Sequence, residues 1–146
     1  MRGEEPAASG RVLALDLGAK RVGVALSDEL RLTVRPLDAL PGTNWKRLVK
    51  ALDELCREFD VREVVLGLPL RLDGSEGDAA AEARRVARKL ELTLRLPVKF
   101  QDERLTSKAA EAALRREGLS VREVSANSDS EAAAIILRDY LSRANG

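Results

Sequence analysis

The feature that most constrains the fold is a change in hydrophobic period along the chain. Two short apolar runs, residues 11–16 and 22–26, have the length and composition of buried strands. From Asn44 the pattern changes, and over residues 45–59 the apolar side chains recur at three- and four-residue spacing, which is typical of one helical face. Strand-like and helix-like segments then alternate. This order predicts an α/β domain, with helices packed on the faces of a mixed sheet.

The expected elements follow from the same patterns. We expect strands at 11–16, 22–26, 30–37, 64–67 and 97–100, and helices over 45–59, 78–94, 106–117 and from Ser128 onward. The first three strands are close enough in sequence to form an antiparallel meander. Pro36 indicates that the third strand ends there or lies at an edge. Residues Ser128–Glu131 form a capping-box pattern, which predicts the start of the last helix.

The chain has the length of a single domain. Its 146 residues fall in the common range of about 100–150. We expect a flexible N-terminal tail over residues 1–10, one domain over 11–142, and a C-terminal tail over 143–146. The N-terminus lacks the features of a signal peptide, no apolar run approaches about 18 residues, and there is a single cysteine. These features predict a cytoplasmic protein with no membrane partner.

The chain contains no histidine, and this restricts the chemistry that it can perform. Ser-His-Asp and Cys-His systems are excluded, and so are zinc sites built on imidazole. Catalysis must use carboxylates, lysine, tyrosine, hydroxyl groups or a hard metal held by carboxylates. The balance of 25 basic and 24 acidic residues neither indicates nor excludes a nucleic-acid partner, since local patches matter more than the total.

Three acidic residues stand where such chemistry can occur. Asp16 follows an apolar strand, Glu103 follows the last expected strand, and Asp129 lies at the expected start of the last helix. A turn, a solvated charge and a helix cap would account for them one by one. Because open α/β sheets place ligands at the carboxyl ends of their strands, the three can also converge. Clustered carboxylates select Mg²⁺ or Mn²⁺, and two such ions about 3.5–4 Å apart can hydrolyse a phosphodiester.

Basic residues and glycines accompany these acids. Each has an ordinary role as a solvated charge or a turn residue, but together they can hold phosphate groups. The candidates for nucleic-acid binding are Lys20, Arg21, Arg71, Gly74, Arg104 and Lys108. Aromatic residues make up only 3% of the chain, so we do not expect base stacking to supply much of the affinity.

Four separated motifs resemble those of the bacterial YqgF family, also called RuvX, over about residues 11–142. The motifs are DLGAKRVGVA at 16–25, VLGLPL at 65–70 with Asp73-Gly74, DERLTS at 102–107, and DSEAAAIIL at 129–137. The resemblance implies a ribonuclease H-like fold. Its five-stranded mixed sheet has the order 3-2-1-4-5, with strand 2 antiparallel, and is flanked by about four helices. By position, the resemblance also implies that Asp16, Glu103 and Asp129 are the catalytic, metal-binding acids, and that Asp102 can share the role of Glu103.

The resemblance implies a Mg²⁺- or Mn²⁺-dependent nuclease that matures the 5′ end of the 16S ribosomal RNA precursor. Some members are instead discussed as resolvases of four-way DNA junctions, for which a homodimer is expected because two strands are cut symmetrically. The nucleic-acid partner is therefore precursor ribosomal RNA, or branched or single-stranded DNA or RNA.

Two further alternatives stay open. One is a nucleotide-binding ATPase, because Asp-Leu-Gly after a first strand also resembles the phosphate loop of sugar kinases and chaperone ATPases. The other is a noncatalytic nucleic-acid-binding protein. Related resolvases place their second acid at the end of the fourth strand, whereas residues 67–70 here contain none. If the chain is a nuclease, its metal site is expected to be weaker than theirs or shifted toward Glu103.

Overall fold

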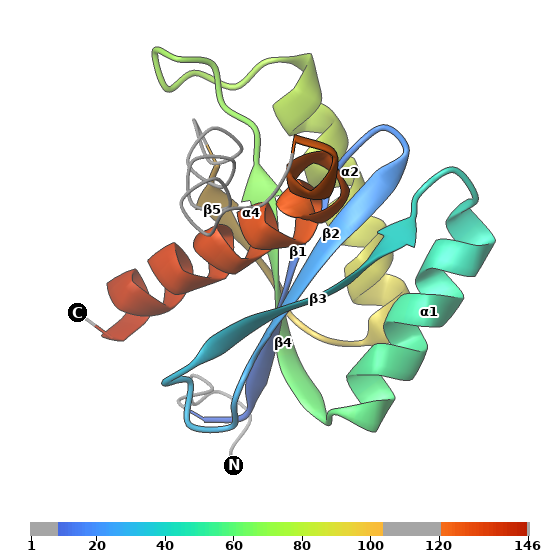
Figure 1. Ribbon diagram of the computed structural model, residues 1–146, viewed down its shortest axis with the longest axis vertical. Helices are drawn as coiled ribbons and strands as arrows, with labels where there is room; N and C mark the ends of the chain where they lie inside the picture. Colours follow the sequence, from blue (N-terminus) through green and yellow to red (C-terminus); the bar gives the residue numbers. More distant parts are fainter. Residues whose placement is uncertain (1–8, 104–120, 146) are drawn as a thin grey trace.

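A five-stranded mixed sheet lies at the centre of the protein in a computed structural model, which describes residues 9–103 and 121–145 (Figure 1). The strands are β1 (Arg11–Leu17), β2 (Arg21–Ser27), β3 (Val34–Pro41), β4 (Val61–Leu68) and β5 (Val98–Asp102). Their order is β3-β2-β1-β4-β5; β2 is antiparallel to β1 and β3, whereas β4 is parallel to β1 and β5. The α/β class and the strand order are therefore confirmed.

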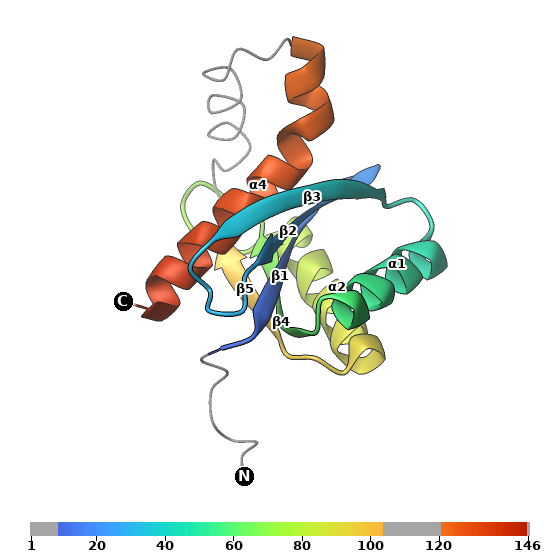
Figure 2. The ribbon, with the colours of Figure 1, turned by 60° about the horizontal axis from the view of Figure 1, so that its bottom comes forward.

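Helices cover both faces of the sheet (Figure 2). α1 (Trp45–Glu58) and α2 (Asp78–Leu94) pack on one face, and α4 (Val121–Asn145) crosses the other. The core is accordingly split into two layers. Neighbouring residues of β1 alternate between them, so that Leu13 packs in the layer of α1 and α2 while Val12 packs in the layer of α4. Burial on both faces explains why β1 reads as an unbroken apolar run.

The third strand begins later in the chain than the sequence predicts. The Asp28 carboxylate accepts hydrogen bonds from the backbone N–H groups of Leu32 and Thr33, at 2.6 and 2.8 Å. Arg31 adopts a left-handed backbone, with φ 61°. The chain completes this turn before it pairs with β2, and so β3 starts at Val34 rather than at residue 30. It is an edge strand, which agrees with one of the two roles expected for its proline.

The last helix begins earlier than expected. The helix α4 starts at Val121, so Ser128 is not its N-cap and Asp129 lies in its interior. Ser and Asn each lower helix propensity by less than about 0.7 kcal/mol, which does not end a helix that tertiary packing holds in place. The helix expected over 106–117 lies outside the described residues. None of the helices in the described part of the chain is both long and apolar enough to cross a membrane.

Candidate active site

The three acids predicted to form a site lie at the same end of the sheet. Asp16 is the penultimate residue of β1, and Glu103 directly follows β5. The backbone N–H of Glu103 donates to the carbonyl of Leu68 at 3.3 Å, which extends the β4–β5 pairing past the end of the strand. Asp129, on α4, lies over Gly23 of β2. The parallel strands therefore deliver two carboxyl groups from their carboxyl ends, and the helix that crosses this face delivers the third.

The carboxyl groups of Asp16 and Glu103 are hydrogen-bonded to each other. Burial raises the pKa of both groups. For Glu103, the hydrogen bond to Asp16 and the charges of Asp16 and Asp102 raise it further, to about 9. For Asp16 the hydrogen bond opposes the effect of burial, while the charge of Asp129 reinforces it. Burial and the neighbouring carboxylates thus favour the protonated form of Glu103, which can donate the hydrogen bond to Asp16.

Asp129 is held beside Asp16 by the close approach of α4 to β2. Gly23 is the cross-strand partner of Asp16, and a Cβ at this glycine would overlap the backbone carbonyl of Asp129. The next helical residue, the buried Ser130, accepts a hydrogen bond through Oγ from the backbone N–H of Val24 at 3.2 Å. A side chain at position 23 would push the helix away, so this glycine determines where Asp129 lies.

The carboxylate of Asp129 is paired with a cation. Its Oδ2 accepts a hydrogen bond from Nε of Arg21 at 2.9 Å, and the two side chains are 28% and 50% exposed. Within residues 9–103 and the described side chains of α4, no three acidic or cysteine side chains lie close enough together to hold a metal ion. The structure thus brings Asp16 and Glu103 together and leaves Asp129 beside them, bound to Arg21.

Gly67 of β4 is a part of the site that was not among the residues predicted from the sequence. A Cβ at this position would lie 2.6 Å from Oε2 of Glu103 and 2.7 Å from Cδ1 of Ile136. The Glu103 carboxylate therefore occupies the space over the end of β4. The end of β4 carries no acid of its own, and the Glu103 carboxylate fills the space there instead. A glycine inside an apolar strand often marks such a close approach, and this signal was available in the sequence.

Two of the predicted phosphate-binding residues lie in the turn between β1 and β2. Lys20 and Arg21 are both exposed there. The turn is closed by a hydrogen bond from the backbone N–H of Gly18 to the carbonyl of Arg21, at 3.0 Å. The turn begins two residues after Asp16, and Arg21 reaches the site through its contact with Asp129.

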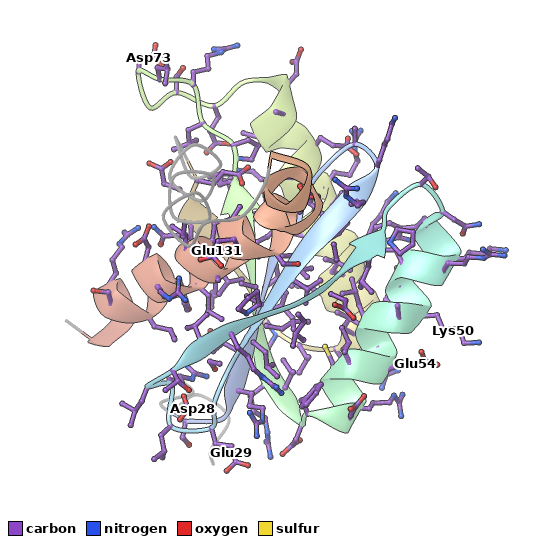
Figure 3. All side chains as sticks on the ribbon, viewed as in Figure 1. Asp28, Glu29, Lys50, Glu54, Asp73 and Glu131 are labelled. Atoms are coloured by element: carbon purple, nitrogen blue, oxygen red, sulfur yellow. The ribbon has the colours of Figure 1, made fainter. Side chains whose placement is uncertain are left out.

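Two more predicted residues lie in the loop between β4 and α2. Arg71 donates through Nη1 to the hydroxyl of Ser75 at 3.4 Å, and Gly74 has φ 88°, a conformation that favours glycine. Figure 3 shows Asp73 of this loop at the periphery of the molecule. Arg104 and Lys108 lie outside the described residues.

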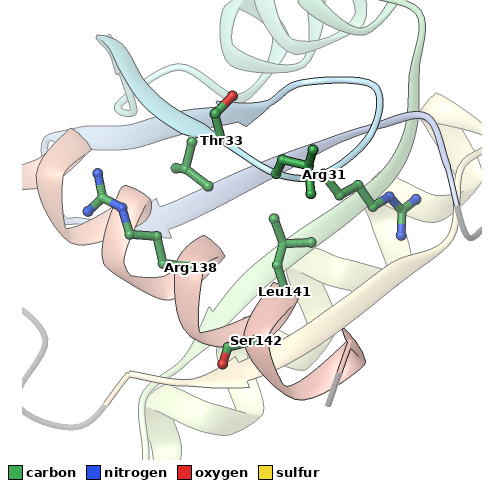
Figure 4. A pocket seen from close by; sticks show the side chains of 7 residues that line it. Arg31, Thr33, Arg138, Leu141 and Ser142 are labelled. Atoms are coloured by element: carbon green, nitrogen blue, oxygen red, sulfur yellow. The ribbon is translucent and has the colours of Figure 1, made fainter.

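A pocket of about 430 Å³ lies at the other end of the sheet (Figure 4). It is lined by residues 31–34, from the β2–β3 connection, and by Arg138, Leu141 and Ser142 of α4. Arg138 at its rim is paired with Glu131 at 3.4 Å. The pocket shares no residue with the carboxylate site.

The chain is similar to known proteins over most of its length. The family described as "RuvX: Holliday junction resolvase" matches residues 10–143. A "Putative pre-16S rRNA nuclease" of Syntrophus aciditrophicus (strain SB) is 45% identical over 131 residues, which cover 90% of this chain and 87% of that protein. A protein of the same name from Anaeromyxobacter sp. (strain K) is 43% identical over 133 residues, covering 91% of this chain and 97% of that protein.

Among solved structures, "T. thermophilus RuvC in complex with Holliday junction substrate" matches with a TM-score of 0.57 and 17% identity. The match covers 93% of this chain and 96% of the RuvC chain. At this level of identity the likeness concerns the fold, and it supports the ribonuclease H-like arrangement described above.

Proposed function

The chain belongs to the RuvX family, also called YqgF, and from this premise we propose that it is a divalent-metal-dependent nuclease of the 16S ribosomal RNA precursor. The observation that carries the proposal is the Asp16–Glu103 pair, two half-buried carboxyl groups in hydrogen-bonding contact with Asp129 beside them. Relatives that are 45% and 43% identical bear the name of a pre-16S rRNA nuclease. We also propose a cytoplasmic location, where such a precursor is processed.

The donor atoms at this site fit a hard divalent cation. In the metal-free protein a shared proton keeps Asp16 and Glu103 in contact, and the raised pKa of Glu103, about 9, expresses how unfavourable two adjacent buried charges would be. In the proposal both residues ionise and hold Mg²⁺ or Mn²⁺ through oxygen, the ligand atom that these ions prefer. Bound there, such an ion supplies Lewis-acid activation for phosphodiester hydrolysis.

The other residues of the site have positioning and binding roles in this proposal. Gly67 leaves room for the Glu103 carboxylate, and Gly23 sets the position of Asp129. Arg21 would exchange its contact with Asp129 for a phosphate oxygen of the substrate, and Asp129 would then be available as a third carboxylate ligand. Residues Lys20, Arg71 and Gly74 contact the phosphate backbone nearby, and Asp102 adds negative charge beside Glu103; Arg104 and Lys108 remain predicted contacts.

The substitution Asp16→Asn tests the proposal, because it removes a charged ligand without changing the size of the side chain. We expect Mn²⁺-dependent cleavage of a labelled 16S precursor to fall by about a thousandfold or more, equivalent to about 4 kcal/mol of transition-state stabilisation. The matched control Asp139→Asn changes an exposed acid of α4 and should cleave like the wild type. Full activity of Asp16→Asn would overturn the mechanism, and binding without cleavage by the wild type would favour a noncatalytic role.

The family description favours one alternative substrate, the four-way DNA junction. Symmetric cutting of two strands would require a homodimer. The same assay with a junction substrate separates the two functions. Paired symmetric nicks, together with a dimer in sedimentation, would favour the resolvase, whereas cleavage of the ribosomal precursor alone favours the proposed function.

A further inference from the structure

Exposed cations lie in the β1–β2 turn and along the first two turns of α1. We call Lys20, Lys46, Arg47 and Lys50 the basic band; all four side chains are exposed. In the described part of the chain none of the four forms an ion pair. Several other surface arginines are paired with acids. These are Arg57, Arg62, Arg84, Arg85 and Arg138.

The backbone joins the two parts of the basic band. The N–H of Gly42 donates to the carbonyl of Lys20 at 2.9 Å, so the loop that leads into α1 lies against the β1–β2 turn. Pro41, at the end of β3, is the cross-strand partner of Arg21. Figure 1 shows the β1–β2 turn and the start of α1 at the same end of the molecule. Arg21, the chain neighbour of Lys20, also contacts Asp129, so the Lys20 end of the basic band lies next to the carboxylate site.

The charges of α1 are arranged opposite to the order that stabilises a helix, which is acids near the N-terminus and cations near the C-terminus. Residues 45–51 contain the three cations of the basic band and no acid, whereas residues 52–58 contain three acids and one arginine. Figure 3 shows Lys50 and Glu54, where the sign changes, on the outer side of the helix. Cations are favoured near a helix C-terminus and disfavoured near the N-terminus by about 0.3–1 kcal/mol each. Helix stability does not explain this arrangement, whereas an anionic partner does.

We propose that the basic band binds the sugar–phosphate backbone of the same nucleic-acid strand that occupies the carboxylate site, along the first two turns of α1. The inference rests on the proposed nuclease function and adds a path for the strand. Lys46 and Lys50 are one helical turn apart on one face, about 6 Å along the axis, close to the span of two phosphates along a strand. Contacts of this kind carry no sequence information. The nearby Trp45 ring is covered by the Lys89 ammonium at 5.3 Å, so the band acts through charge.

The test compares two triple variants with the same change in charge. Lys46→Gln/Arg47→Gln/Lys50→Gln removes the helical part of the basic band. Arg88→Gln/Arg95→Gln/Lys99→Gln removes three exposed cations from α2, its C-cap and β5. Both are made in the Asp16→Asn background, and binding of fluorescein-labelled oligouridine is followed by anisotropy in EDTA over a range of salt concentrations.

For an oligonucleotide of about 20 residues, the band variant should lose about 2 from the slope of log K against log salt, since each single-strand contact contributes about 0.7. Its affinity at about 0.1 M salt should fall on the order of tenfold or more, and the loss should be smaller for an oligonucleotide of about 6 residues. The control variant should keep the parent slope. Thermal unfolding shows whether each variant is folded.

Equal losses in both variants, or an unchanged slope in the band variant, would overturn the inference. With Asp16 restored, the band variant should raise KM for the long precursor while kcat stays near the control value, as expected for a purely binding contribution. A different result would overturn the proposed nuclease function, namely a wild type that cleaves neither RNA nor DNA with Mn²⁺. A path over α2 instead of α1 would appear as a loss confined to the control variant, and it too would contradict the proposal.

Discussion

Both ends of the sheet remove charged groups from water, but they neutralise these groups in opposite ways. At the carboxyl end of the parallel strands, Asp16 and Glu103 place like charges in contact and need a proton between them. At the other end, Arg31 and Glu63 form an ion pair at 3.3 Å, with side chains only 7% and 8% exposed. In the first pair burial favours the protonated form of Glu103, whereas in the second the opposite charges of Arg31 and Glu63 compensate each other within the chain. The opposite-charge pair is thus a structural contact, whereas the like-charge pair is the one to which the proposed function assigns a cation.

The end of the sheet that holds the Arg31–Glu63 pair also has further hydrogen bonds. Nε of Arg31 donates to the carbonyl of Gly10 at 2.8 Å. Tyr140 on α4 is hydrogen-bonded to Glu63, and burial together with the Glu63 charge and this hydrogen bond raises the pKa of Tyr140 to about 12. The network joins the segment before β1, the β2–β3 turn, β4 and α4. This network holds the C-terminal half of α4 in place, just as Gly23 sets the position of the part near the carboxylates.

The largest expected effect on stability comes from breaking the opposite-charge pair. Glu63→Gln would leave the Arg31 guanidinium buried without a counter-charge, and we expect the free energy of unfolding to fall by about 3–5 kcal/mol in a urea titration. Metal-dependent cleavage per folded molecule should change little. The control Arg31→Met/Glu63→Met removes both charges and should recover part of the loss. A cost below about 1 kcal/mol for Glu63→Gln would contradict the structural role of the pair.

The next effect is expected at Gly67, where a Cβ would meet Oε2 of Glu103 at 2.6 Å and Cδ1 of Ile136 at 2.7 Å. Gly67→Ala should lower the free energy of unfolding by about 1–3 kcal/mol, typical of overpacking, and should also displace Glu103. The gain in melting temperature on adding Mn²⁺ should therefore shrink. Gly42→Ala is the control, because its Cβ would meet Cγ2 of Val22 at 3.3 Å and the side chain can shift. An Ala variant at position 67 with full metal response would show that the space over β4 is not needed.

A smaller effect should appear in the pH dependence of stability. The pKa of Glu103 is raised from its ordinary value to about 9 in the folded protein, so the folded state binds more protons than the unfolded state between these two values. The free energy of unfolding in EDTA should then fall as pH rises from about 5 to about 8, by about 1–2 kcal/mol after screening by solvent. Glu103→Gln should remove this decline, and Mn²⁺ should counteract it in the wild type. A decline of the same size in Glu103→Gln would assign it to other groups.

The sequence predicted the elements that depend on apolar periodicity and missed those that depend on side-chain hydrogen bonds. The helices α1 and α2 and the strands β1, β2 and β4 follow from hydrophobic patterns that packing enforces. The start of β3 depends on the Asp28 carboxylate, which holds the preceding turn through two backbone groups. No periodicity encodes such a contact. Similarly, Ser128 resembles a helix cap, but α4 continues through it because the tertiary packing of the helix outweighs local preference.

For the site, position along the strands was enough to predict that Asp16 and Glu103 converge, since both end parallel strands of one sheet. It was not enough to predict the partner of Asp129. That residue lies within α4, and its pairing with Arg21 depends on how closely the helix approaches Gly23. The Arg31–Glu63 pair was missed because a charge next to an apolar run is read as solvated unless its partner is known. Contacts across long sequence separations are the part that a single sequence does not specify.

The smallest effect on stability is expected at Arg21, which lies between the two kinds of charge arrangement. Its ion pair with Asp129 joins partly exposed side chains, and Arg21→Gln should change the free energy of unfolding by about 0–1 kcal/mol. The same substitution frees the Asp129 carboxylate, so the rise in melting temperature with Mn²⁺ should be larger than in the wild type, whereas affinity for RNA should fall. Arg57→Gln is the control, because it removes another exposed ion-pair arginine, far from the site. An unchanged metal response in Arg21→Gln would mean that Arg21 does not compete with the cation. Asp129 would then be a structural charge, paired within the fold as Glu63 is with Arg31.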